Sequence, residues 1–251
     1  MQITRNEEYV TSRKRLRARV SLASFGLLIA VMLLPFFIDS QAVVFLWPLF
    51  FLVFVLTNAS KQLQFNWGPG MQADERLAQA LKPLNNRYWL GAYVPVGKYV
   101  VDQLLVGPEG VLVLEARNHP GEISCVRGRW RRKAGIFSRL FGPIPPLGDP
   151  SRDIAATMDA VRNDLDEAGL QDVPVSGAVV FTAPGVALNL DECSQTAMTL
   201  AQLESWAAKR RNSPSTEVIP DSVRLQVIER YASRIPGGAP TGSARPKAPV
   251  R

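Results

Sequence analysis

Two long apolar stretches near the N-terminus constrain this chain more than any other feature. The first covers 20–38 (VSLASFGLLIAVMLLPFFI), and the second covers 42–57 (AVVFLWPLFFLVFVLT). A helix rises about 1.5 Å per residue, so the first stretch is long enough to cross a hydrocarbon core of roughly 30 Å. The polar residues 39–41 suffice for a tight turn. The pattern therefore predicts a transmembrane helical hairpin over 20–57, with the lipid bilayer as a partner.

Two other interpretations of these stretches stay open. A cleaved signal peptide needs a shorter apolar region and a small-residue cleavage site, and a second apolar stretch would not follow it at once. A buried hairpin within a soluble domain is the other alternative, because the second stretch is short for a membrane span.

Flanking charges predict the orientation of the hairpin. Basic side chains cluster at 13–19 and Lys61 follows the second stretch, whereas the turn at 39–41 has no Lys or Arg. The positive-inside rule places both ends in the cytoplasm. We therefore expect a multi-pass membrane protein with two spans and a cytoplasmic soluble domain.

The net charge of +7 belongs to the ends of the chain. The basic N-terminus, 1–19, and the tail, 236–251, carry the excess, so the body between them is neutral on average. A uniformly basic nucleic-acid-binding domain is therefore not indicated.

The cysteine and histidine content excludes several kinds of site. Cys125 and Cys193 have neither metal-type spacing nor the number needed for a disulfide framework. We expect both to be reduced thiols in a cytosolic compartment. The single histidine, His119, excludes a multi-histidine metal centre, and Pro120 after it favours a turn.

The rest of the chain has the pattern of an α/β domain. We expect a linker over 58–70, this domain over 71–235 and a disordered tail over 236–251. The nearly continuous apolar run at 175–181 predicts a buried, parallel strand. A mixed sheet with helices on both faces follows from the predicted order. The expected helices cover 72–82, 151–168, 201–211 and 221–232, and the expected strands cover 88–96, 99–106, 110–117, 121–130, 175–181 and 197–200.

One pair of strands brings acidic residues together. Glu115 and Arg117 are two apart on a predicted strand, so they share a face. If that strand pairs with the preceding one across the turn at 107–110, Asp102 lies opposite Glu115 or close to it. Two carboxylates on adjacent strands suit a hard divalent cation, Mg²⁺ or Mn²⁺, and Asp74 or Glu75 could supply a third. Such a site suits phosphodiester hydrolysis, because a metal lowers the pKa of a bound water.

The stretch 71–184 resembles the nuclease-related domain (NERD) family, within the restriction-endonuclease-like PD-(D/E)xK superfamily. The resemblance rests on ADERLAQAL at 73–81, on VVDQLLVGPEGVLVLEARNHPGEI at 100–123, on Trp130 and on DPSRDIAATMDAV at 149–161. It implies a restriction-endonuclease-like mixed sheet flanked by helices and metal-dependent cleavage of DNA or RNA. Bacterial members also carry N-terminal membrane anchors, which implies a prokaryotic inner membrane.

The resemblance also implies roles for single residues. Asp74, Asp102 and Glu115 fall on the metal-binding acids of the family, and Asn118 falls on its asparagine. Arg117 stands where the family has a catalytic lysine, and Asp153 stands where it has a glutamine.

Arg117 separates the two functions that we expect. A lysine can exchange a proton beside a metal-bound water, whereas an arginine with a pKa above about 12 effectively cannot. The sequence thus predicts either a metal-dependent nuclease with a large loss of rate or a degenerate binding or interaction module at the membrane. A structural ion pair at a sheet edge, and a lipid or assembly role of the hairpin, are further alternatives.

A basic cluster follows the acidic residues. It could grip phosphates, and the tryptophan within it could stack on a base. A solvated loop or contact with the membrane surface would also explain it. The cluster consists of Arg127, Arg129, Trp130, Arg131, Arg132 and Lys133.

Overall fold

The computed structural model describes residues 1–33, 73–133, 146–212 and 218–237, together with Pro48, Phe51, 53–55, Thr57 and Ile144. The predicted linker and nearly all of the predicted tail lie outside these residues. The described elements are β1 (Gln2–Arg5), α1 (Glu7–Leu33), α3 (Ala73–Ala80), β2 (Trp89–Val96), β3 (Tyr99–Gly107), β4 (Gly110–Arg117), β5 (Glu122–Val126), β6 (Arg129–Arg132), α5 (Pro150–Glu167), β7 (Val175–Phe181), β8 (Ala187–Asp191), β9 (Thr196–Thr199), α6 (Leu200–Asn212) and α7 (Asp221–Ala232).

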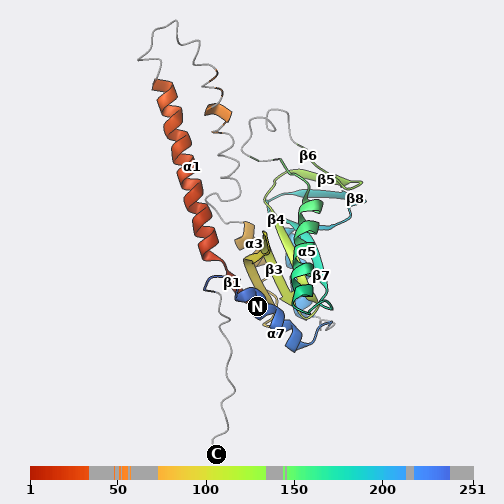
Figure 1. Ribbon diagram of the computed structural model, residues 1–251. Coiled ribbons are helices and arrows are strands. Elements are labelled where there is room, and N and C mark those ends of the chain that lie inside the picture. The colour runs from red at the N-terminus through yellow and green to blue at the C-terminus, as the bar shows by residue number, and fades with distance from the viewer. Residues whose placement is uncertain are drawn as a thin grey trace, which may run out of the picture.

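The main sheet is mixed, as the sequence predicted. Its strand order is β1-β2-β3-β4-β7-β9. The β2–β3 and β3–β4 pairs are antiparallel, whereas β7 is parallel to both β4 and β9. Helices cover both faces, so the predicted α/β class with a sheet flanked by helices is confirmed (Figure 1).

Each face of the sheet has its own apolar core. On one face, Ile154 and Val161 of α5 and Val227 of α7 pack with the strand residues. On the other, Leu77 of α3 and Leu203 of α6 pack with Leu114 and its neighbours. β7 is covered on both faces of the sheet, because its side chains belong to both apolar cores. This explains why its residues form a continuous apolar run.

The N-terminal residues form a strand that the sequence analysis did not predict. β1 adds to the edge of the sheet in parallel with β2, and Arg5 lies opposite Ala92. Asn6 then caps α1: its Oδ1 accepts the backbone N–H of Tyr9 at 3.0 Å, and its Nδ2 donates to the Tyr93 carbonyl. Residues 1–19, expected as a basic segment ahead of a membrane anchor, thus begin as part of the sheet.

The prediction of two membrane spans is wrong. Among the described residues, there is no helix with the length and apolar character needed to cross a membrane. α1 extends away from the sheet (Figure 1). Most of the second predicted span, 42–57, lies outside the described residues.

A second, three-stranded sheet replaces the single strand expected over 121–130. Its order is β6-β5-β8, with β5 antiparallel to β6 and parallel to β8. Arg127 and Gly128 both have positive φ, 50° and 72°, which is the conformation of a two-residue hairpin turn. This turn breaks the expected strand into β5 and β6.

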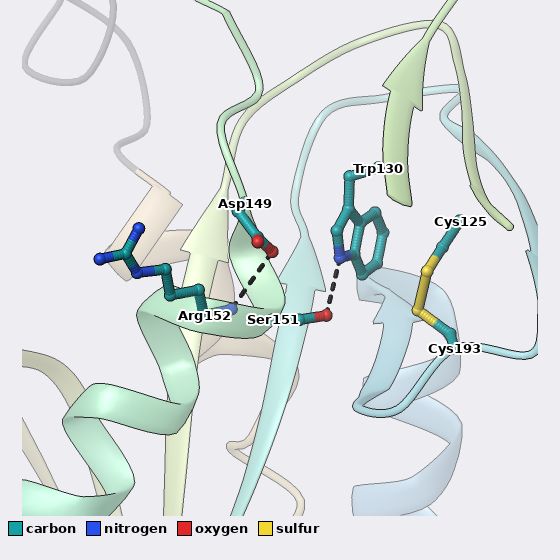
Figure 2. The surroundings of a disulfide bond; sticks show 6 residues. All are labelled: Cys125, Trp130, Asp149, Ser151, Arg152 and Cys193. Atoms are coloured by element: carbon teal, nitrogen blue, oxygen red, sulfur yellow. Dashed lines mark hydrogen bonds between the residues drawn. A yellow bond between two sulfur atoms is a disulfide. The ribbon is translucent and has the colours of Figure 1, made fainter. Parts of the chain in front are cut away.

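The two cysteines are paired, not reduced as we expected. Cys125 of β5 and Cys193 form a disulfide with a Cα–Cα distance of 5.8 Å (Figure 2). Sequence spacing could not indicate this pair, because 68 positions separate the two residues and only the fold brings them together. Disulfides persist mainly in oxidising surroundings, so the cysteines no longer indicate a cytosolic compartment.

Replacing Asp164 by asparagine should destabilise the fold by roughly 2 kcal/mol at neutral pH. Asp164 of α5 is buried and accepts hydrogen bonds from Arg230 of α7 at 2.9 Å and from Arg234 at 2.6 Å. Burial acts to raise the pKa of this carboxyl, but the two arginines outweigh burial and lower the pKa below its usual value. The stabilisation by ionised Asp164 is therefore present above the pKa of an aspartate in the unfolded chain, near 4. It is lost as the pH falls through the lower pKa of Asp164 in the folded protein.

Urea denaturation at pH 7 and near pH 3 tests this. Asp166→Asn is the matched control, because Asp166 is an exposed aspartate of the same helix. If Asp164→Asn lowers the free energy of unfolding as much near pH 3 as at pH 7, the ionised Asp164 carboxylate is not the source of the stabilisation.

Candidate functional site

The predicted register of β3 and β4 is confirmed. Gln103 pairs with Leu114 and Gly107 with Gly110, so continuing the register places Asp102 across from Glu115. The two predicted carboxylates are therefore neighbours at one end of the sheet.

Arg117 occupies the space beside Glu115. Its guanidinium Nη2 contacts Glu115 Oε1 and lies 2.5 Å from Asp153 Oδ2. Asp153 belongs to the first turn of α5, whose start is fixed by Pro150 and by the Asp149 carboxylate, which accepts the Arg152 backbone N–H at 3.2 Å (Figure 2). Arg117 and Asp153 thus form one ion-paired group with Glu115.

Asp74 is paired with a different arginine. Its Oδ2 lies 2.8 Å from Arg5 Nη2, and Arg5 also contacts Glu75 at 3.3 Å. Asp74 is only 6% exposed. β1 therefore supplies the counter-charge for the acid of α3, an interaction between residues far apart in sequence that no local pattern signals.

Burial raises the pKa of the central carboxylates. The pKa of Asp102 is raised to about 6, mainly by burial and further by the charge of Asp74, although Arg117 lowers it. The pKa of Glu115 is raised to about 7, again mainly by burial, with Arg117 lowering it and Asp102 and Asp153 raising it. Burial also raises the pKa of Asp74 despite Arg5. Carboxyls with shifted pKa values gathered at one place are typical of functional sites.

Tyr93 is a residue of this region that the sequence analysis missed. It lies on β2 across from Asp102, and its φ is +58°, a conformation that is costly for a bulky side chain. Burial and the charges of Asp74 and Asp102 raise the pKa of its phenol. Strained backbone of this kind clusters at functional sites. No sequence pattern around Tyr93 predicts the strain.

The acids as placed do not fit a resident divalent cation. Within the described part of the chain, no group of three or more His, Cys, Asp or Glu side chains could hold a metal ion. Arg5 takes one oxygen of Asp74, and Arg117 takes one oxygen of Glu115. The remaining oxygens, Asp74 Oδ1 and Glu115 Oε2, are buried without a hydrogen-bond partner.

The domain assignment follows from comparison with known families. Residues 69–182 match the model of the nuclease-related domain, NERD. No curated protein and no solved structure matches the chain. The match confirms the resemblance at the level of the domain, and it contains α3, β2 to β6, α5 and β7, the elements that carry the acidic residues.

The basic cluster of the NERD region divides between the two faces of the three-stranded sheet. Arg129 and Arg131 alternate with Trp130 and Arg132 along β6, and only the first pair is exposed. Lys133 and Arg127 are also exposed. Lys133 forms an ion pair with Glu122 at 3.1 Å, and Arg127 forms one with Glu192 at 3.8 Å. The outer face therefore carries cations next to Ser124 and Val126 of β5, which line the same hollow.

Trp130 lies on the inner face of the three-stranded sheet, which corrects the expected interleaving. Its Nε1 donates to Ser151 Oγ at 2.8 Å (Figure 2), and its ring centroid is 5.8 Å from that of Phe181. Trp130 thus joins this sheet to α5 and the core. Because side chains alternate along a strand, Trp130 does not share a surface with Arg129 and Arg131, and base stacking beside them has no aromatic partner on β6.

Proposed function

We propose that this protein binds nucleic acid through the outer face of its three-stranded sheet and does not cleave it with a divalent metal. The observation that carries the proposal is the position of Arg117, whose guanidinium pairs with Glu115 and Asp153. An arginine keeps its charge at any accessible pH, so it neutralises these carboxylates permanently and cannot exchange a proton as the family's lysine can.

Strand binding is assigned to Arg129 and Arg131. Both point outward from β6, and neither forms an ion pair with another described residue. Two same-face residues of one strand present their charges in a row, which suits successive phosphates of a backbone. Contacts of this kind release counterions and make affinity fall with salt.

The Arg129→Ser/Arg131→Ser variant should bind a single-stranded oligonucleotide less tightly at low salt. The slope of log Kd against log salt should fall by about 1.4, since each phosphate contact to single strands contributes ~0.7. Fluorescence anisotropy over a series of salt concentrations measures this. The matched control is Lys209→Ser/Arg211→Ser, which removes two exposed cations from the last turn of α6. This turn lies beside Glu109 in the β3–β4 turn of the main sheet, away from β6. Equal slopes for both variants would refute the assignment to β6.

Metal-dependent phosphodiester hydrolysis is the second candidate. The two unpartnered buried oxygens, Asp74 Oδ1 and Glu115 Oε2, favour it, because such oxygens suit a hard cation. Arg117→Lys tests it: restoring the family's residue should give Mn²⁺ binding by calorimetry and cleavage that Glu115→Gln abolishes. If the wild type already cleaves as fast as Arg117→Lys, the second candidate replaces the first. If neither binds Mn²⁺, hydrolysis by this site is excluded.

A further inference from the structure

A second polar site lies on the face of the sheet that α3 covers. A pocket of about 300 Å³ opens between α3 and strands β1, β2 and β3. Leu90, Ala92 and Ala78 form its apolar walls, and Asp74 and Gln103 supply its polar groups. Its size is at the lower limit for pockets that hold small organic ligands.

Gln103 is the unexplained residue of this pocket. It lies between Ala92 and Leu114 on the central strand β3 and is only 1% exposed. Neither its Oε1 nor its Nε2 has a hydrogen-bond partner among the described residues. Burying an amide without partners is costly, and native proteins keep few such groups. An amide left unpaired on a pocket wall indicates a partner that enters the pocket.

Asp74 adds a second acceptor from the α3 side of the pocket. Its Oδ2 is held by Arg5, which leaves Oδ1 buried and without a partner. The pocket therefore offers the two N–H donors of Gln103 Nε2 and two acceptor oxygens, Gln103 Oε1 and Asp74 Oδ1. Its charges balance, since Arg5 and Lys82 are matched by Asp74 and Glu75. A flat ligand that carries both hydrogen-bond donors and an acceptor matches these groups.

We infer that the pocket binds a single nucleobase and prefers guanine. The inference rests on the proposed function, because it places one base of a bound strand, or a free nucleotide, at this wall. Guanine presents the carbonyl O6 to the amide donor and its N1–H and N2–H groups to the two acceptors. Adenine lacks that order of donors and acceptors, so it would leave a buried group unpaired, and sites built on hydrogen bonds discriminate strongly against such analogues.

Mononucleotide binding to the full chain tests the pocket. Ligand-observed NMR titrations with GMP, AMP, CMP and UMP should give a Kd for GMP at least tenfold below the others. Gln103→Leu should weaken GMP binding at least tenfold, and its urea midpoint should stay equal to that of the wild type or rise, because it removes an unpaired buried amide. Ala78→Met, which fills the pocket without touching the amide, should also lose binding.

Two oligonucleotides separate a strand base from a free nucleotide. A ten-residue oligothymidine and the same strand with one central guanine are compared by anisotropy. Tighter binding of the guanine strand, lost in Gln103→Leu, identifies a strand base; GMP binding with no difference between the strands identifies a free nucleotide.

The inference is overturned if no mononucleotide binds and the two strands bind equally. It is also overturned if Gln103→Leu or Ala78→Met binds GMP as the wild type does, or if Gln103→Leu unfolds at lower urea, which would mean that the amide is already satisfied. If the protein binds oligonucleotides but shows no preference for guanine, only the guanine pocket is refuted. If the protein binds GMP but no oligonucleotide, only the proposed strand binding is refuted.

Discussion

Replacing Cys125 and Cys193 together by alanine should lower the free energy of unfolding by about 4 kcal/mol. The disulfide closes a loop across 68 positions, and cross-linking a loop of that length restricts the unfolded chain by about this amount. Cys125 is fully buried on the inner face of the three-stranded sheet, where Ile123 joins the main core. Alanine is the better replacement there, since serine would bury a hydroxyl.

Urea denaturation with and without reductant measures the effect. Reductant should shift the midpoint of the wild type toward that of the double alanine variant and should leave the variant unchanged. A wild type that unfolds at the same urea concentration in both conditions would show that the two thiols are not bonded. Arg129→Ser/Arg131→Ser should respond to reductant as the wild type does, because it changes only the outer face.

The second large effect is a pH-dependent gain in stability on changing Glu115 to glutamine. The pKa of Glu115 is about 7 in the folded protein against a usual value of 4.5. A carboxyl whose folded pKa is raised contributes stability below its unfolded pKa, and this contribution is lost as the pH rises through the folded value. Between about pH 4.5 and 7 the wild type should therefore lose on the order of 3 kcal/mol through this residue.

Glu115→Gln carries no ionisable group at this position, so it should match the wild type near pH 4.5 and exceed it at pH 8. Glu122→Gln is the matched control, because Glu122 is an exposed glutamate on β5. Denaturation curves at several pH values give the difference in unfolding free energy between each variant and the wild type. A Glu115→Gln variant that is less stable than the wild type at pH 8 would mean that the Arg117 ion pair outweighs the burial of Glu115.

Much of the NERD region could be predicted because its signals are local. The register of β3 and β4 follows from the turn at 107–110, and the neighbouring positions of Asp102 and Glu115 follow from that register. The helix predicted over 151–168 likewise corresponds to α5. These features depend on residues within a few positions of one another.

The features that could not be predicted depend on contacts between distant residues. β1 is a short polar strand that is stable only against β2, so its sequence carries no strand signal and Arg5 was not connected to Asp74. The membrane hairpin was predicted from hydropathy alone, and among the described residues no helix is long and apolar enough to cross a membrane. The disulfide and the inward orientation of Trp130 both arise from the second sheet, whose turn at 127–128 has positive φ at a non-glycine residue.

The most direct test of the central claim is a single experiment on labelled single-stranded DNA with the full chain. Binding and cleavage are followed together, once with Mn²⁺ and once with EDTA. The ion-paired site predicts the same Kd in both conditions and no cleavage in either. Cleavage that requires Mn²⁺ and disappears in Glu115→Gln would contradict the account, because it would mean that a metal displaces Arg117 from the carboxylates.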